Sequence, residues 1–489
     1  MTIERWSIPN RWVWCTAADV ARIVGGGTPS TKVPENFSNN GIAWIGPADL
    51  TNYRKTYIGR GRRDLSERGY ANSGATLLPA GAVLFSSRAP IGYCAIAANP
   101  ICTNQGFKSW VCENGVSPEF VRHYLLASTD YADSLASGTT FREVSTKRVE
   151  SMAFPLPPTT EQLRIVAKID GLTARLARAR AELDRSSALA AQLRKQSVCR
   201  AFDGSLTADW RMVRDDSGIV TDDALDQAYR IEAGSPRRKP PSEIDWRPRF
   251  NVPPSWRWVS IDRVVAQVQY GSSAKTTSDS SGVPVLRMGN IQQGKLDRTD
   301  LKYLPRDHHE FPDLLLKQGD VLFNRTNSFE LVGKAAVCGD LNKPTSFASY
   351  LIRIRPSGIL PELLSAYLNS PFARSWIERV ASQQVGQANV NGSKLKALGI
   401  PLPPFDEQAE ILQRLSNVFA HADRLEAEAS RVRVLLDRLE ASIFTKAFSG
   451  ELMPQDPNDE PASVLLDRIR AQRASTPKTK GRRKRAVAV

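Results

Sequence analysis

Four polar stretches carry the side chains that could do chemistry in this chain. Two of them are "FSSRAP" from Phe85 and "FNRTNS" from Phe323, and the other two are "SGTTFREVSTKR" from Ser137 and "SQQVGQANVNGSK" from Ser382. Arginine pairs with guanine, asparagine and glutamine pair with adenine, and lysine, serine and threonine hold phosphates. These residue types predict contacts to DNA, although each stretch alone is more typical of a solvated loop. The candidate DNA-binding residues are Ser86, Ser87, Arg88, Thr140, Arg142, Ser145, Lys147, Arg148, Asn324, Arg325, Thr326, Asn327, Gln384, Gln387, Asn389, Asn391, Ser393 and Lys394.

Motifs for catalysis are missing from the sequence. We find no G-x-x-x-x-G-K-[ST], no H-E-x-x-H, no G-x-S-x-G, and no motif pair of the amino-methyltransferases. "GGGTPSTK" at Gly25 has the wrong spacing for a P-loop, so it is either a flexible turn or a phosphate contact. Four histidines, and six cysteines without a C-x-x-C pair, leave little to build a metal site. We therefore expect no catalytic residue, no metal and no cofactor in this chain.

The charge of the chain is unevenly distributed. Its formal net charge is +15, and "RASTPKTKGRRKRAVAV" from Arg473 holds seven lysines and arginines but no acid. A tail of this kind attracts polyanions or solubilises the protein. The sequence has no apolar run of about 18 residues, no signal-peptide core at "MTIERWSIPNRW", and cysteines that suit reduced thiols. These features predict a cytoplasmic protein without a membrane segment.

The chain contains an internal repeat. "PLPPTTEQ" at Pro155 recurs as "PLPPFDEQ" at Pro401, and residues 155–206 match residues 401–452 at a constant shift of 246. The blocks before these segments correspond more loosely, since "GAVLFSSR" resembles "GDVLFNRT". The polar stretches therefore recur at equivalent places in both halves, which strengthens the prediction that they contact DNA.

Both copies of the repeat predict a long helix. Apolar residues recur at alternating steps of four and three over about 40 residues, which at about 1.5 Å per residue gives a rod of about 60 Å. This narrow stripe favours pairing of the two helices as a coiled coil over packing of each helix on its own domain. Thr159 with Gln162 is typical of a capping box, Asp406 of an N-cap, and Gly204 and Gly450 of C-caps. The predicted pairing residues are Ile165, Ile169, Leu172, Leu176, Leu183, Leu193, Ile411, Leu415, Val418, Leu425, Val432, Leu436, Leu439 and Ile443.

Each block before a long helix mixes short strand-like runs with helices, which predicts an α+β fold. Short helices are expected at "DALDQAYRIEA" and at "EPASVLLDRIRAQRA". The predicted boundaries are a globular domain at 1–154, a long helix at 155–206, a linker with a short helix at 207–250, a second globular domain at 251–400, a second long helix at 401–452, a short helix at 453–475 and a basic tail at 476–489.

Over nearly its whole length the chain resembles the specificity subunits of type I restriction–modification systems. The resemblance rests on "PLPPTTEQLRIVAKID" and "PLPPFDEQAEILQRL", on the "AFxGxL" ends of both helices, and on "ASVLLDRIRAQRA". It implies that each globular block is a target-recognition domain for one half of a bipartite double-stranded DNA target. It also implies antiparallel helices that set the spacing between the half-sites and dock two methyltransferase subunits.

The resemblance further implies that partner chains do the chemistry. They would methylate adenine with S-adenosylmethionine and cleave DNA with ATP and Mg²⁺, and whether a restriction subunit is present stays open. Two other functions stay open as well. One is a self-contained DNA methyltransferase or nuclease fused to recognition domains, and the other is a coiled-coil adaptor that binds only proteins.

Overall fold

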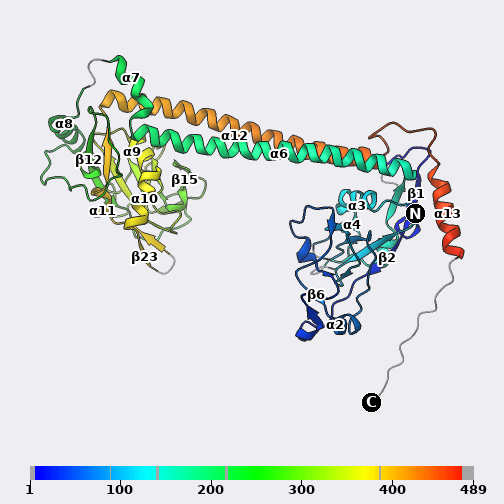
Figure 1. Cartoon of the computed structure of the whole chain (residues 1–489). Coiled ribbons are helices and arrows are strands. Elements are labelled where there is room, and N and C mark those ends of the chain that lie inside the picture. Colours follow the sequence, from blue (N-terminus) through cyan, green and yellow to red (C-terminus); the bar gives the residue numbers. More distant parts are fainter. Residues whose placement is uncertain (1–5, 89, 139–141, 215–217, 385–386, 476–489) are drawn as a thin grey trace. The chain divides into compact units, whose positions relative to one another are not determined.

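The chain folds into two compact units, each of which can be followed in the computed structural model of Figure 1. Unit 1 comprises residues 1–183 and 431–489, and unit 2 comprises residues 184–430. Each unit combines short strands with helices, which confirms the predicted α+β class. No helix among the described residues is both long and apolar enough to span a bilayer. The structure describes residues 6–88, 90–138, 142–214, 218–384 and 387–475.

Unit 1 is built on a mixed sheet of five strands. Helix α3 (Pro118–Ala127) packs on this sheet and fully buries Phe120 and Tyr124. All neighbouring strands are antiparallel except the last two, which are parallel. The strand order is β2 (Ala21–Gly25), β10 (Lys108–Cys112), β7 (Val83–Phe85), β8 (Cys94–Ala97) and β5 (Tyr57–Ile58).

Unit 2 repeats this core with an antiparallel sheet of four strands. Helix α9 (Pro361–Leu368) packs on the sheet and fully buries Tyr367. The four strands correspond in order to the first four of unit 1, so the repeat seen in the sequence extends to the sheets. Their order is β13 (Val265–Tyr270), β22 (Leu351–Pro356), β18 (Val321–Asn324) and β20 (Ala335–Val337).

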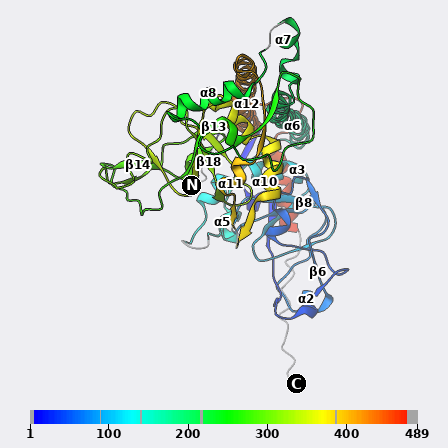
Figure 2. The same ribbon diagram turned by 90° about the vertical axis from the view of Figure 1, so that its left-hand side faces the viewer.

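Each long helix is followed by a short helix that packs on the unit where the long helix ends. Helix α8 (Asp222–Ala233) lies along β13 in unit 2 and buries Leu225 (Figure 2). Helix α13 (Ala462–Ser475) packs on α1 (Ala17–Val20) in unit 1 and buries Leu465. The sequence predicted both short helices, but it did not show that α13 completes the first globular unit.

The repeated "PLPP" phrase ends a strand and starts a helix in each unit. Strand β11 (Ala153–Leu156) pairs antiparallel with β1 (Val13–Thr16), and β25 (Gly399–Leu402) pairs in the same way with β12 (Arg257–Ser260). The two prolines that follow each strand have no N–H for a ladder, and the start of a helix does not need one. The phrase therefore changes strand into helix at the same point of both units.

The glutamate of the phrase binds the tryptophan that directly precedes the first strand of its own unit. In unit 1 Trp12 Nε1 donates a hydrogen bond to Glu161 Oε2 at 2.9 Å, and in unit 2 Trp256 Nε1 donates to Glu407 Oε2 at 2.7 Å. Both carboxylates are at most 1% exposed. This bond joins the first strand of each unit to its long helix, and it explains why both copies share these two residues.

The glutamine of the phrase bonds to the backbone of the globular block. Gln162 Oε1 accepts a hydrogen bond from Ser117 N, and Gln408 Oε1 accepts one from Leu360 N, both at 2.8 Å. The predicted capping box is therefore wrong. Gln162 does not reach back to cap the helix, and the Thr159 hydroxyl donates to a carbonyl outside it.

The ends of the long helices follow the sequence signals only in part. The glycines behave as predicted, because Gly204 and Gly450 adopt φ values of 81° and 74° two residues after the last residues of the helices. Asp406 is not an N-cap as predicted, because α12 (Phe405–Phe448) already begins one residue earlier. Its charge instead lies in the first turn, where a carboxylate is favourable to the helix dipole. The first long helix is α6 (Thr159–Phe202).

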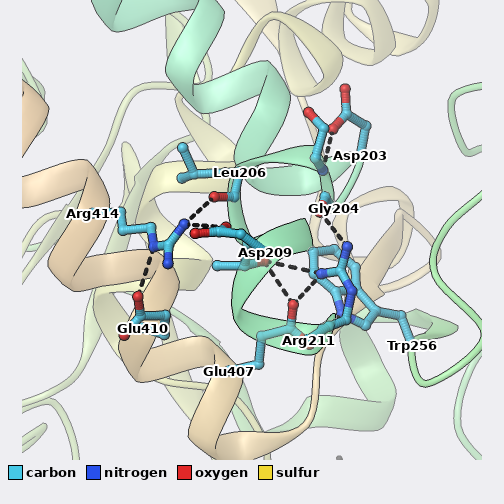
Figure 3. Close-up of polar contacts among 11 residues, drawn as sticks. Asp203, Gly204, Leu206, Asp209, Arg211, Trp256, Glu407, Glu410 and Arg414 are labelled. Carbon is cyan, nitrogen blue, oxygen red and sulfur yellow. Dashed lines mark hydrogen bonds and ion pairs between the residues drawn. The ribbon is translucent and has the colours of Figure 1, made fainter. Parts of the chain in front are cut away.

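In unit 2 the buried Glu407 also meets a cation from the segment that follows α6 (Figure 3). Arg211 contacts Glu407 Oε1, and Thr207 Oγ1 donates to the same oxygen at 2.7 Å. Further along α12, Arg414 Nη1 donates to Asp209 Oδ1 at 2.6 Å. These bonds fasten the segment after α6 to the first turns of α12.

Unit 1 places a neutral group where unit 2 has Arg211. Gln455 Nε2, from the segment after α12, donates to Glu161 Oε1 at 2.6 Å. Burial, without a cation in direct contact, raises the pKa of Glu161 above its ordinary range. The equivalent glutamates of the two units therefore have different partners, because Glu407 contacts the cation of Arg211 and Glu161 contacts the neutral amide of Gln455.

The helices α6 and α12 pack against each other in both units (Figure 1). The first turns of α6 share the core of unit 1 with the last turns of α12, and the last residues of α6 share the core of unit 2 with the first turns of α12. Arg180 of α6 bonds to Asp437 and Glu440 of α12 at 2.6 and 2.7 Å. The helices are therefore antiparallel, and the prediction that they pair is confirmed.

The residues of the predicted pairing stripe differ in their exposure. Leu193, Leu425 and Leu439 are the exposed ones, at 36%, 38% and 50%, and their place in the interface between the helices stays a prediction. Ala422 and Ala429 are at most 4% exposed, and such small residues bring the helices close and push longer side chains to the flank. The other residues of the stripe are buried or half-buried, namely Ile165, Ile169, Leu172, Leu176, Leu183, Ile411, Leu415, Val418, Val432, Leu436 and Ile443.

Candidate nucleic-acid interface

In unit 2 the two predicted polar stretches form one small sheet. Strand β19 (Thr326–Asn327) pairs with β24 (Gln387–Asn389), which pairs with β23 (Ser382–Gln384). Thr326 lies directly opposite Asn389 in this register. Two stretches that are far apart in the sequence are therefore paired strands of one sheet.

Arg325 is braced beside this sheet. Its Nη1 donates to Ser349 O at 3.3 Å, and its Nη2 donates to Asn389 Oδ1 at 3.2 Å. The guanidinium carbon lies 4.8 Å from the ring centre of Tyr270, whose hydroxyl accepts a hydrogen bond from Gly392 N at 2.7 Å. Stacking and hydrogen bonds restrict the side chain, which lowers the entropy lost when it binds a base or a phosphate. Sequence reasoning missed Tyr270, because only the fold brings its ring under this arginine.

Unit 1 brings the equivalent stretches together. Arg88 forms a β-bridge with Glu143, and Val144 N donates to Ser87 O at 2.9 Å. Lys108 Nζ lies 3.2 Å from Glu143 Oε1 and balances the charge of that carboxylate. Each unit thus places the stretch that leaves its central sheet beside the stretch that precedes its long helix.

Three of the predicted contact residues are fully buried. Ser86 Oγ donates to one carbonyl at 2.7 Å and accepts from an amide at 2.8 Å, and Ser87 Oγ donates to another carbonyl at 3.2 Å. Asn324 Nδ2 donates to a carbonyl at 3.5 Å. These groups shape the turns that present Arg88 and Arg325, whereas contact with DNA stays a prediction for all five residues.

Two predicted residues cap short helices next to the interface. Ser145 caps α5 (Thr146–Glu150), and Asn391 caps α11 (Gly392–Lys396). Asn391 Oδ1 accepts a hydrogen bond from Lys394 N at 2.8 Å, and Ser145 Oγ accepts one from Arg148 N at 3.4 Å. Both oxygens therefore stabilise helix starts at corresponding places of the two units.

Several predicted cations line the same stretches. Lys147 and Arg148 are exposed, and Arg142 is exposed while it pairs with Asp133 at 3.1 Å. Lys394 Nζ donates to a backbone carbonyl at 2.7 Å. Side chains of this kind are suited to phosphate contacts, which hold a protein in register on a duplex.

The remaining predicted residues have varied positions. Gln384 of β23 and Gln387 of β24 lie opposite each other in the strand register. Asn327 Oδ1 accepts from the following amide at 2.8 Å, and Ser393 is exposed. Thr140 lies outside the described residues.

The groups gathered at these surfaces are hydrogen-bond donors and acceptors rather than reactive groups. Burial raises the pKa of the Cys94 and Cys338 thiols to about 12, which keeps them protonated and unreactive. Within the described ranges, no cluster of three or more His, Cys, Asp or Glu side chains could hold a metal ion.

Known proteins share this sequence pattern. The chain matches the family described as "Type I restriction modification DNA specificity domain" over residues 9–183 and 265–432. The type I restriction enzyme EcoKI specificity subunit of Escherichia coli strain K12 is 27% identical over 383 residues, which cover 75% of this chain and 74% of that protein. The EcoBI specificity subunit of Escherichia coli is 25% identical over 403 residues, which cover 79% of each chain.

Solved structures share the fold. A chain described under "Structural basis underlying complex assembly and conformational transition of the type I R-M system" superposes with a TM-score of 0.68 at 20% identity, over 91% of this chain and 100% of that one. The HsdS subunit from Thermoanaerobacter tengcongensis superposes with a TM-score of 0.57 at 20% identity, over 92% of this chain and 100% of that one. At these identities the likeness concerns the fold.

Proposed function

The chain belongs to the type I restriction–modification DNA specificity family, and from this premise we propose that each unit reads one half of a bipartite double-stranded DNA target. The family match includes most of both globular blocks and parts of both long helices, and it covers more than half of the chain. It confirms the resemblance carried by the "PLPPxxEQ" repeat. It also favours a specificity subunit over a self-contained methyltransferase or nuclease and over an adaptor that binds only proteins.

The observation that carries the proposal is the interface that both units repeat. The same two polar stretches meet in unit 1 and in unit 2, but their side chains differ. Unit 1 offers Arg88 and Arg142, whereas unit 2 offers Arg325, Asn327 and Asn389. Because base edges are distinguished by donor and acceptor pattern, different side chains on one scaffold predict two different half-sites.

We infer that two methyltransferase subunits dock on the long helices. Leu189 and Leu193 of α6 in unit 2 are 58% and 36% exposed, and Leu435 and Leu439 of α12 in unit 1 are 57% and 50% exposed. The two pairs occupy the same positions of the repeat, and each pair lies on one face of its helix. Exposed apolar pairs of this kind support two equivalent docking sites.

The docking sites can be tested one at a time. Replacing Leu435 and Leu439 together by serine is expected to reduce the bound methyltransferase from two copies to one, because the equivalent pair on α6 is intact. The measurement is the mass of the assembled complex, with the Leu189 and Leu193 double variant as the matched control. Two bound copies in both variants would contradict docking at these leucines.

We infer that the helix pair also sets the spacing between the two half-sites. Each helix has 44 residues, which corresponds to about 65 Å at about 1.5 Å per residue. A spacer of fixed length between two recognition domains would give a target with a fixed gap.

Chemistry is assigned to partner subunits. We infer that S-adenosylmethionine binds the methyltransferase subunits, and that ATP and Mg²⁺ serve cleavage by a restriction subunit where one is present. The chain itself would then be no enzyme. A cytoplasmic location is supported by its six cysteines, all of which are free thiols.

Sequencing methylated adenines tests the proposed function directly. The complex of this chain with its methyltransferase subunits is expected to methylate a single bipartite motif with a fixed gap. The chain alone, incubated with S-adenosylmethionine and DNA, is expected to produce no methyladenine. Methylation by the lone chain, or a continuous motif without a gap, would contradict the proposal.

A further inference from the structure

One turn that holds a non-glycine residue with positive φ recurs at the same place of both units. In the described part of the chain, Asn52 and Gln293 are the non-glycine residues with positive φ, at 60° and 50°. Each lies three residues after a side chain that closes a 3₁₀ turn. Asp49 Oδ2 and Asn290 Oδ1 both accept the amide three residues before them at 2.8 Å. The repeat therefore preserves an unusual backbone conformation as well as a fold.

In unit 2 a pair of strands connects this turn to the candidate interface. The strand before the turn, β14 (Val283–Leu286), pairs in parallel with β21 (Ser346–Phe347). Two residues after β21, the carbonyl of Ser349 accepts the hydrogen bond from Arg325. The turn that holds Gln293 thus follows β14, and the partner strand of β14 leads to the carbonyl that binds the guanidinium of Arg325.

Unit 1 repeats this arrangement. Strand β4 (Trp44–Ile45) pairs in parallel with β9 (Cys102–Thr103), and the carbonyl of Gly106 after β9 accepts from Ser87 N at 2.8 Å. A Cβ added to Gly106 would lie 3.4 Å from Cγ of Pro47 in the turn. The turn of unit 1 therefore neighbours the polar stretches, and the turn of unit 2 is connected to them through the equivalent pair of strands.

The residue type at the tip is not explained by the fold. Gln293 and Gly294 form the two-residue loop of a hairpin between β15 (Ile291–Gln292) and β16 (Lys295–Leu296). This loop needs positive φ at both positions, which favours Asn, Asp or Gly at the first of them, so a glutamine there costs free energy. Residues in such sparsely populated conformations cluster at functional sites. The Gln293 side chain is exposed, and so is that of Asn52.

We propose that these two turns are DNA-reading tips, at which Asn52 and Gln293 each place a carboxamide on an adenine edge in the major groove. Both tips carry a carboxamide, the group that pairs bidentately with adenine. No other described residue forms a hydrogen bond with the side chain of Asn52 or Gln293. Exposed cations follow each tip, namely Arg54 and Lys55 in unit 1 and Lys295 in unit 2, and these suit the flanking phosphates. The inference rests on the proposed function and deepens it by adding one recognition residue to each half-site.

Glycine substitution separates reading from folding. Glycine adopts positive φ without strain, so Gln293→Gly removes the carboxamide and is expected to melt at or above the temperature of the unaltered chain. In the complex with methyltransferase subunits, Gln293→Gly is expected to relax one position of the half-site read by unit 2. The loss of discrimination there should be about 5- to 150-fold, the range of one bidentate base contact. Asn52→Gly is expected to relax one position of the other half-site, so each variant is the control for the other.

The methylated motifs of both variants decide the inference. A motif unchanged in sequence and in discrimination would show that the turns are structural and would overturn it. A uniform fall in rate on all sequences would assign the tips to the phosphate backbone and would overturn it as well. A wild-type complex without a bipartite motif would contradict the proposed function itself, whereas a bipartite motif that neither variant alters contradicts only the reading tips.

Discussion

Replacing Glu407 by glutamine tests how much the charge of this residue stabilises the packing of α12 in unit 2. The carboxylate is fully buried and accepts hydrogen bonds from Trp256 and Thr207, both at 2.7 Å. It also contacts Arg211, whose side chain is 18% exposed. Glutamine keeps the size of the side chain and one acceptor oxygen, but it leaves the guanidinium without an anion.

The magnitude follows from the burial of the pair. Removing one partner of a fully buried ion pair costs about 3–5 kcal/mol, because the other charge stays behind unpaired. Arg211 keeps some solvent and a 3.0 Å hydrogen bond to Thr207 Oγ1, so we expect the lower value of about 3 kcal/mol. For a unit of this size, that loss lowers the melting temperature by about 6–12 °C.

Glu161→Gln is the matched control in unit 1. Glu161 occupies the same position of the repeat and accepts from Trp12, but its second partner is the neutral Gln455. Glutamine at position 161 can still accept from the tryptophan, and a flip of the Gln455 amide supplies an acceptor for its NH₂ group. We expect a change below about 1 kcal/mol, since no unpaired charge is created.

Thermal unfolding of the two variants, followed by tryptophan fluorescence, measures the difference. Hydrogen exchange of the peptide that contains β12 should report the loss in the Glu407 variant and not in the Glu161 variant. Equal destabilisation by both substitutions would show that shape rather than charge explains the conserved position in the repeat. No destabilisation by Glu407→Gln would refute the argument from the buried ion pair.

Three further predictions concern pH, base recognition and spacing. Burial raises the pKa of Glu161 in the folded state, so ionisation of this carboxyl opposes folding. The free energy of unfolding should therefore fall as the pH rises above the ordinary pKa of 4.5. Unfolding measured across pH should show this fall in the unaltered chain and not in Glu161→Gln. Arg325→Ala should cost about 1–3 kcal/mol and relax one position of one half-site in the methylated motif, whereas equal weakening on all sequences would assign Arg325 to the DNA backbone or to bracing Asn389. One heptad added after both Ala181 and Ala427 lengthens the rods by about 10 Å. At about 3.4 Å per base pair, the gap in the motif should grow by about three, and an active variant with the parental gap would contradict the spacer role.

The sequence by itself determined the features that depend on neighbours along the chain. The shift of 246 residues between the two "PLPPxxEQ" phrases determined the duplicated architecture. The four-and-three spacing of apolar residues determined both long helices and their pairing, because a stripe that narrow can face only one partner helix. Gly204 and Gly450 marked the helix ends, because a helix end of this kind needs a residue with left-handed backbone and glycine adopts that conformation readily.

Only the tertiary structure decided which side of each element is buried and which distant segments meet. Composition made Ser86 and Asn324 candidates for DNA contact, and only the fold shows that both are buried. The same fold brings Tyr270 under Arg325 and sends α13 back to the first globular unit. These outcomes depend on contacts between residues far apart in the sequence, where the free energy of burial outweighs the local preference of any one side chain.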